Sequence, residues 1–219
     1  MTKIYKIIQG NPTKIIVILI CLMLLSGCFT EATPPTPIYY ETYSENGLSF
    51  QYPADFSIST EEKIKPESNG QAGKLTTISL KNSDSSTIIK IDLIEDPLRD
   101  VMFPGQYPPS ENLLRGFVAG EIGNINISKS EANESAGKEA IEKAEIKPIS
   151  SHHAALFKAQ FEDEKFGEIY LRGAVVVTEK RDINIIMLGI SGVSENQIVN
   201  SEFIDKLWSE IINSISITY

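Results

Sequence analysis

The last third of the chain carries a run of strands with period-two alternation. Apolar residues alternate with polar ones over residues 155–161, and strand-forming residues fill 169–178 and 183–190. Such alternation places apolar side chains on one face of a strand. Charged turn sequences at 162–167 and 179–182 separate the three segments and have hairpin length. This pattern predicts a meander of long antiparallel strands.

Three further strands are predicted in the first half of the chain. Residues 48–52 alternate, and Pro53 ends that segment because it lacks a backbone N–H donor. Residues 75–81 and 87–94 flank the polar turn sequence 82–86, which predicts a second hairpin. A short strand is also indicated at 125–127. Together these segments predict an α+β domain with an antiparallel sheet of about six strands.

Two helices are indicated between and after the strands. Ser110 offers an N-cap for a segment with apolar pairs at 113/114 and 117/118. Ser194 and Gln197 have the spacing of a capping box ahead of a wide apolar stripe that contains Trp208. We expect this stripe to pack on the sheet rather than to bind a ligand. Residues 136–146 are compatible with either a helical turn or a mobile insertion.

The amino terminus has the pattern of an export signal. Lys3, Lys6 and Lys14 precede an uncharged apolar run over residues 15–25, which is shorter than the roughly 20 residues that span a bilayer. The run ends in Leu-Ser-Gly-Cys, which resembles the lipobox of prokaryotic lipoproteins and makes Cys28 the lipidated residue. The alternative is an uncleaved anchor helix, and either reading leaves the domain outside the membrane.

Three regions follow from this assignment. Residues 1–27 are expected to be the signal peptide, 28–37 a Pro- and Thr-rich tether about 30 Å long, and 38–219 the folded domain. Two acyl chains on Cys28 would make a stable membrane anchor. The expected location is therefore the outer face of the cell membrane or the cell envelope. Cys21 leaves with the signal, so no disulfide is expected.

The net charge of the chain bears on which kinds of molecule it can bind. Removing the three lysines of the signal takes the net charge from −9 to −12. Nucleic acids and anionic membrane surfaces are recognised through clustered basic residues. A nucleic-acid partner is therefore not expected.

The two ends of the domain carry packing motifs. The opening segment, residues 47–56, has a glycine, an alternating strand, Tyr-Pro and then an aromatic, and residues 211–217 pass from helix to strand. Both motifs resemble those of the PsbP family. The family more often has an aromatic at the positions of Leu48 and Ile215 and a tryptophan at that of Phe56. The resemblance implies the PsbP/Mog-type fold, a central antiparallel sheet with helices on its faces (an αβα sandwich). It also implies use as an accessory or docking module.

The sequence shows no pattern of catalytic residues. There is no nucleophile elbow, no phosphate-binding glycine loop and no free cysteine in the mature chain. His152 and His153 are adjacent, so on a strand they would point to opposite faces and would not chelate one metal. Residues 162–164 are acidic but lack the spacing of a calcium loop. We expect no enzyme activity, no cofactor and no metal.

One loop is a candidate binding element. Residues 96–109 contain four prolines and several large apolar residues, among them Met102, Phe103 and Tyr107. Long loops of this kind are often functional. The alternative, which we favour, is a flap that closes the core.

The function predicted from these observations is a lipid-anchored, non-catalytic accessory or binding module that docks on a membrane or envelope protein. A second hypothesis is a small-ligand-binding lipoprotein associated with a transporter, which predicts a two-lobed parallel α/β chain. An envelope hydrolase is a third, and it requires a pocket with perturbed titratable groups.

Overall fold

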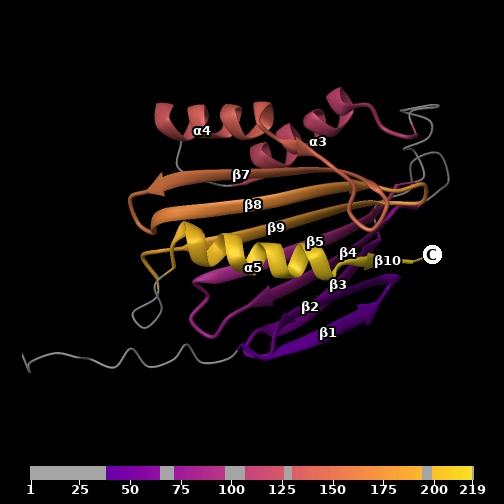
Figure 1. Cartoon of the computed structure of the whole chain (residues 1–219), viewed down its shortest axis with the longest axis horizontal. Coiled ribbons are helices and arrows are strands. Elements are labelled where there is room, and N and C mark those ends of the chain that lie inside the picture. Colours follow the sequence, from indigo (N-terminus) through magenta and orange to yellow (C-terminus); the bar gives the residue numbers. More distant parts are fainter. Residues whose placement is uncertain (1–37, 65–71, 97–106, 126–129, 194–198, 219) are drawn as a thin grey trace, which may run out of the picture. The chain divides into compact units, whose positions relative to one another are not determined.

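Seven antiparallel strands form the central sheet of the computed structural model, which describes residues 38–64, 72–96, 107–125, 130–193 and 199–218. These residues belong to one compact unit, Ile38–Tyr219. The strand order is β3 (Ser57–Ile64), β4 (Lys74–Lys81), β5 (Thr87–Glu95), β9 (Asp182–Ile190), β8 (Gly167–Val177), β7 (His153–Asp163) and β6 (Glu145–Ile146). Every neighbouring pair is antiparallel (Figure 1). The predicted α+β class, meander and β4–β5 hairpin are confirmed.

Five of the seven strands of the central sheet were predicted, and the two that were not, β3 and β6, have no strand pattern in the sequence. β3 is polar over most of its length and all eight of its residues are exposed, so it shows no apolar alternation. β6 has only two residues. The short strand predicted at 125–127 is not seen in the described part of this segment. Ile125 is instead the C-cap of α3, and residues 126–127 lie outside the described residues.

A second, three-stranded sheet contains the predicted opening strand. Its order is β1 (Tyr40–Glu45), β2 (Leu48–Pro53) and β10 (Ser216–Ile217). Asn46 and Gly47 join β1 to β2 with φ values of +52° and +66°, as a tight two-residue hairpin turn requires. β10 follows the last helix directly, which confirms the helix-to-strand ending.

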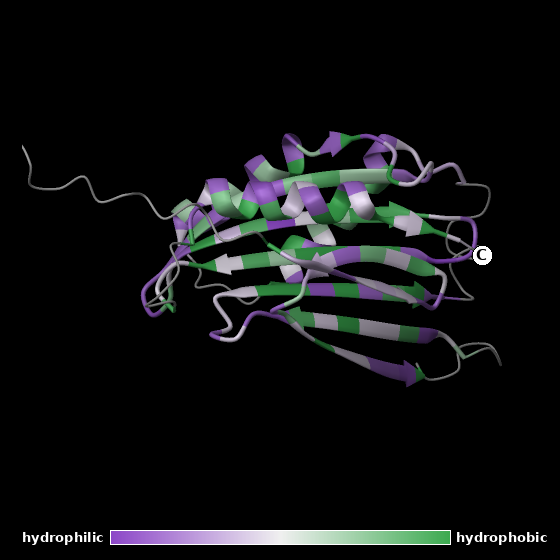
Figure 2. Cartoon of the chain, turned by 60° about the horizontal axis from the view of Figure 1, so that its bottom comes forward, coloured by the Kyte–Doolittle hydropathy of each residue, from purple (hydrophilic) through white to green (hydrophobic). Residues whose placement is uncertain are grey.

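Side chains of the central sheet alternate between two separate cores. On β8, Tyr170, Ala174 and Val176 face a core shared with the last helix and the small sheet. Leu171 and Val175, with opposite parity, face a core shared with the two middle helices. Alternating apolar and polar bands are visible along the strands in Figure 2. The chain is thus an αβα sandwich, with α3 (Glu111–Asn124) and α4 (Glu131–Glu142) on one side and α5 (Ser201–Ser214) on the other.

Side-chain oxygens cap each of the three helices in the described part of the chain. Ser110 accepts a hydrogen bond from the Leu113 N–H, as predicted, and Ser130 caps α4 in the same way. Residues 131–142 are therefore helical, which settles the 136–146 segment in favour of the helical alternative up to residue 142. α5 begins at Ser201 behind the N-cap Asn200, so the helix start predicted at Ser194 is wrong. Ser194 and Gln197 themselves lie outside the described residues. The first apolar residues of the stripe, Phe203 and Ile204, lie in the first turn of the helix.

The apolar stripe of α5 is buried against the first core. Trp208 is 9% exposed, and the other buried residues of the helix are Ile204, Leu207, Ile211 and Ile212. The prediction that the stripe forms core is confirmed. Among the described residues, no helix has the length and apolar character needed to cross a bilayer.

Replacing Trp208 with Ala should lower the free energy of unfolding by about 3–5 kcal/mol, because the ring leaves a cavity between α5 and the sheet. Urea unfolding followed by circular dichroism measures the change. The matched control is Lys206→Ala, an exposed position of the same helix. A loss below about 1 kcal/mol for the tryptophan variant would contradict the packing of α5 described above.

Candidate functional site

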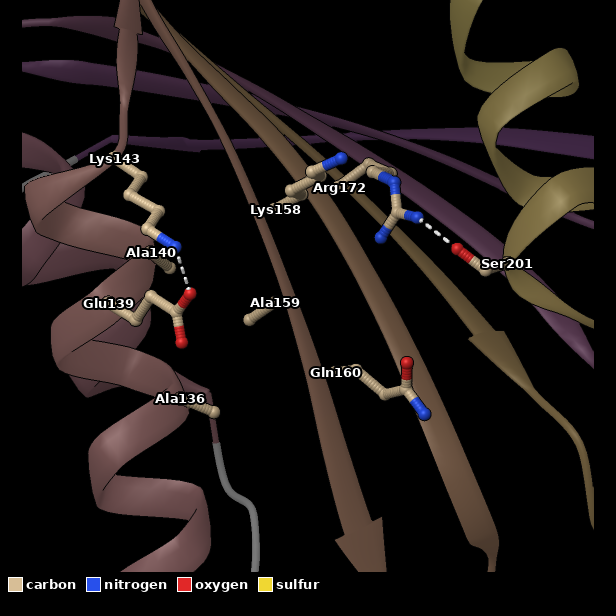
Figure 3. A pocket seen from close by; sticks show the side chains of 9 residues that line it. All are labelled: Ala136, Glu139, Ala140, Lys143, Lys158, Ala159, Gln160, Arg172 and Ser201. Atoms are coloured by element: carbon tan, nitrogen blue, oxygen red, sulfur yellow. Dashed lines mark hydrogen bonds and ion pairs between the residues drawn. The ribbon is translucent and has the colours of Figure 1, made fainter.

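A groove of about 400 Å³ runs beside β7, between α4 and the start of α5. We call it the β7 groove. Figure 3 shows its lining, which comes from α4, β7, β8 and α5: Ala136, Glu139, Ala140, Lys143, Lys158, Ala159, Gln160, Arg172 and Ser201. An adjoining hollow of about 250 Å³ shares Lys143, Lys158 and Arg172, and adds Lys147 and Asp205. Their charged lining residues are four basic ones, Lys143, Lys147, Lys158 and Arg172, and three acidic ones, Glu139, Glu145 and Asp205.

The backbone of β7 is left without a strand partner along the groove. Lys147 N–H donates to the Ala154 carbonyl at 3.1 Å, so the even-numbered residues of β7 direct their N–H and C=O groups away from β8. Leu156 pairs with Glu145, the first residue of β6, so the pairing with β6 does not extend to Lys158. The outward backbone groups of Lys158 and Gln160 have no hydrogen-bond partner in the described part of the chain.

Asn133 of α4 ends this unpaired stretch on its other side. Its amide nitrogen donates to the Glu162 carbonyl at 2.9 Å, and its amide oxygen accepts from the Glu162 N–H at 3.0 Å. The side chain therefore takes the place of a neighbouring strand at one residue. It also fixes α4 beside the edge of β7. One and two turns further on, Ala136 and Ala140 line the groove with methyl groups only.

Arg172 lies under the groove as a buried anchor. Its side chain is 5% exposed, and its guanidinium donates to Asp205 Oδ1 at 2.5 Å, to Ser201 Oγ at 2.8 Å and to the Leu171 carbonyl at 2.7 Å. The hydrogen bond from Arg172 lowers the pKa of the Asp205 carboxyl. Two of the three acceptors belong to the first turns of α5. The arginine therefore holds the end of that helix against β8.

Lysines surround the mouth of the groove. Lys143 pairs with Glu139 at 2.5 Å and Lys147 with Glu145 at 3.0 Å. Lys158 forms no ion pair with any described residue, although its charge helps to lower the pKa of Asp205. The groove thus carries an uncompensated positive charge in a protein whose net charge is −9.

Few of the residues singled out from the sequence lie at this site. Tyr107 is 39% exposed and sets its ring edge-on to His153, with ring centres 6.0 Å apart. It does not line the β7 groove. Met102 and Phe103 of the candidate loop, and Cys28, lie outside the described residues.

The histidines and the acidic turn do not form a metal centre in the described structure. His152 is half-buried just before β7, and burial lowers its pKa. Asp163 Oδ1 accepts hydrogen bonds from the N–H groups of Lys165 and Phe166 at 2.9 and 3.2 Å, which closes the predicted hairpin turn. No group of three or more potential ligands is found among the described residues.

Sequence reasoning missed the β7 groove because its residues form no motif. The available hint was the pattern of residues 155–161, where Lys158 and Gln160 take the polar positions of an alternating strand. That pattern identifies a solvent-facing side of the strand. It does not reveal that the strand lies next to the edge of the sheet, because strand order is a tertiary property.

No protein-family model matches the chain, and no curated protein matches it. Solved structures do match. A protein from Bacteroides thetaiotaomicron VPI-5482 is 13% identical with a TM-score of 0.41, over 79% of this chain and 46% of the other. The chain therefore spans less than half the length of that protein.

Two further structures match over most of both chains. Cyanobacterial PsbP (CyanoP) from Synechocystis sp. PCC 6803 is 11% identical with a TM-score of 0.48, over 85% of this chain and 97% of the other. PA94 from Pseudomonas aeruginosa, a protein of unknown function, is 13% identical with a TM-score of 0.29, over 69% and 83% of the two chains. No residue role is carried over from these proteins.

Removing the Asp205 carboxylate should destabilise the fold, because it leaves the buried Arg172 guanidinium short of an acceptor. We expect Asp205→Ala to lower the free energy of unfolding by about 2 kcal/mol at pH 7. Since the folded pKa of Asp205 is lowered, its contribution is present above the unfolded pKa and is lost as the pH falls through the folded value. The gap between wild type and variant should therefore narrow in acid.

Urea unfolding at pH 7 and near pH 3 tests both parts, with Lys206→Ala as the control on the same helix. An equal stability of Asp205→Ala and wild type at pH 7 would show that Arg172 does not depend on this carboxylate. A gap that widens in acid would contradict the lowered pKa.

Proposed function

We propose that this chain is a lipid-anchored, non-catalytic binding module on the outer face of a cell membrane or in the cell envelope. In this proposal it docks on a membrane or envelope protein through the β7 groove. The membrane contact is the lipid on Cys28, and the protein contact is an extended, acidic segment of the partner.

The observation that carries this proposal is the unpaired backbone of Lys158 and Gln160. An exposed strand edge binds an extended peptide through main-chain hydrogen bonds, while adjacent side-chain pockets select the sequence. Here the free edge is bounded by β6 at one end and by Asn133 at the other. The available length therefore suits a short segment that adds two or three residues to the sheet.

Charge supplies the selectivity. Lys158 has no ion-pair partner in the described structure, and Lys143 and Lys147 stand beside it. An acidic side chain on the bound segment would face Lys158 without displacing an existing pair. Complementary charge of this kind raises the rate of association and rejects partners of the wrong sign.

The charges of the groove support binding rather than catalysis. A lysine that acts as a nucleophile or base needs a lowered pKa. The hydrogen bond and charge of Glu139 raise the pKa of Lys143 instead. Arg172 is committed to holding α5, as described above. Lys158, which forms no ion pair with any described residue, is the group that presents positive charge to a partner.

The second hypothesis, a small-ligand-binding lipoprotein associated with a transporter, has one observation in its favour. A volume of about 400 Å³ falls within the range of ligand pockets, which is roughly 300–1,000 Å³. The two-lobed parallel architecture that this hypothesis predicts is absent among the described residues, whose strands are all antiparallel. We therefore place it second.

A photo-crosslinking amino acid at Gln160 tests the docking proposal in the protein's own membrane. We expect it to capture one membrane or envelope protein reproducibly, whereas the same amino acid at the exposed Lys206 should not. Lys158→Glu should reduce the capture at least tenfold, because it places like charge against the acidic segment. Lys138→Glu, an equal charge reversal on the exposed side of α4, should leave it unchanged.

Equal capture from positions 160 and 206 would contradict docking at the groove, and so would equal effects of the two charge reversals. Failure to capture any protein, combined with a small molecule bound at the groove, would favour the second hypothesis.

The lipid anchor has a separate test. Cys28→Ala should abolish labelling by radioactive fatty acid and leave the unprocessed precursor, because the variant lacks the acceptor thiol. Labelling and gel mobility of the two forms in their own host measure this outcome. Normal processing and detergent partitioning of the variant would refute the lipobox assignment.

A further inference from the structure

The opposite edge of the central sheet has no paired strand among the described residues. β3 pairs only with β4, and each of its eight residues is exposed. Its first half, at Ile58 and Thr60, lines a hollow of about 430 Å³ together with residues of β1. The Asn82 N–H donates to the Thr87 carbonyl at 3.2 Å. The even-numbered residues of β4 therefore direct their backbone N–H and C=O groups toward β5, and the odd-numbered residues direct theirs toward β3. By the register of Ser57 with Lys81, the even-numbered residues of β3 direct their backbone groups outward.

These outward backbone groups are free in the described structure. They belong to Ile58, Thr60, Glu62 and Ile64, and no described residue forms a hydrogen bond with them. The strand contains no glycine, no proline and no break in its register with β4. Natural proteins usually interrupt or cover an edge of this kind, because it is a template for pairing with another chain.

Two exposed isoleucines accompany the free backbone. Ile58 is 37% exposed and Ile64 is 80% exposed, and both belong to the small set of large apolar side chains left exposed in the described residues. They have the same parity, so they lie on the same face of the sheet. A strand that pairs with β3 would cover both.

We propose that β3 pairs antiparallel with β3 of a second copy of this chain, about a twofold axis that passes through Glu61. In this register, and in no other, all four residues whose backbone groups point outward pair with such residues of the other copy. Ile58 then lies opposite Ile64 of the second copy, and Thr60 lies opposite its Glu62. The same register brings the exposed isoleucines of the two copies together. The apolar pattern and the hydrogen-bond pattern of the strand therefore select one arrangement, and the partner is self-complementary as a twofold interface requires.

Charge at the axis limits the strength of this pairing. Glu61 would lie opposite its own copy, and like charges directly opposite one another are destabilising. Lys63, which pairs with Glu61 at 3.2 Å in one copy, would lie diagonally across from Glu61 of the other and offset part of that repulsion. The interface is small, so the association is of the weak or transient class.

Engineered disulfides test both the pairing and its register in the purified full-length chain. At the axis the two Cα atoms of residue 61 would be about 4.5 Å apart, which a disulfide can bridge. Glu61→Cys should therefore form a covalent dimer on mild oxidation. Ser59→Cys alone or Lys63→Cys alone should not. In each of these variants the cysteines of the two copies would be displaced by four residues along the strands, which is roughly 13 Å.

A mixture of Ser59→Cys and Lys63→Cys chains should form the mixed dimer, because residue 59 lies opposite residue 63. We expect at least tenfold more dimer from Glu61→Cys, and from the mixture, than from either single control. The parent chain measures any background from Cys21 and Cys28. Equal crosslinking of all three single variants, or none from Glu61→Cys, would overturn the proposal.

Sedimentation of variants without added cysteine provides an independent reading. Thr60→Pro removes an outward N–H and leaves the pairing with β4 intact, so it should abolish self-association without lowering the melting temperature. Glu61→Gln should strengthen the association severalfold by removing the like charges. An unchanged association constant in both variants would also overturn the proposal.

Discussion

Nine consecutive residues of β8, positions 169–177, are buried, so this strand requires cover on both faces. The cover differs between the two sides. α3 and α4 supply it on one face, and α5 with the small sheet supplies it on the other. The described helices and the three-stranded sheet are large enough to cover the two faces of the middle strands only. The margins of the sheet are left with partial cover or none.

The two edges of the central sheet, at β7 and at β3, differ in how their backbone groups are covered. The candidate site lies at the partly covered edge, β7. At β7 the edge is shielded by β6 and then by the Asn133 amide, with a gap at Lys158 and Gln160. At β3 no described strand pairs with the outward edge, although residues of β1 line a hollow together with Ile58 and Thr60. A gap bounded on both sides suits recognition of a short segment, whereas an open strand suits pairing with another whole strand.

Electrostatics and fold are linked at the β7 groove. Arg172 is buried at the base of the groove, and its hydrogen bonds to Asp205 and Ser201 join β8 to the start of α5. Lys158 is the accessible end and carries the charge that remains uncompensated. One arginine thus serves structure, while one lysine on the neighbouring strand is available for a partner.

The sequence predicted the parts of the fold that depend on local pattern. The meander, the β4–β5 hairpin, the opening strand and the core stripe around Trp208 were predictable because apolar period and turn residues are local signals. β3 was not predictable, since an exposed edge strand has no buried face to create alternation. The start of α5 was misplaced because Ser194 and Asn200 are both good N-caps, and only packing chooses between them.

The candidate site was predictable to a much smaller extent. Lys158 and Gln160 are ordinary residues that become distinctive only through strand order, and Asn133 replaces a strand partner across 29 positions of sequence. The loop around Met102, Phe103 and Tyr107 was the natural candidate from the sequence because its apolar content is a local feature. The groove instead draws on four elements that are separated along the chain.

Hydrogen exchange of individual backbone amides, measured by NMR on the full-length protein, shows whether the β7 edge is free to pair at two residues. We expect rapid exchange for Lys158 and Gln160, and slow exchange for the neighbouring Phe157 and Ala159, whose backbone groups point toward β8. Slow exchange of all four amides in the isolated protein would show that the edge is already occupied, and would contradict the proposed docking site.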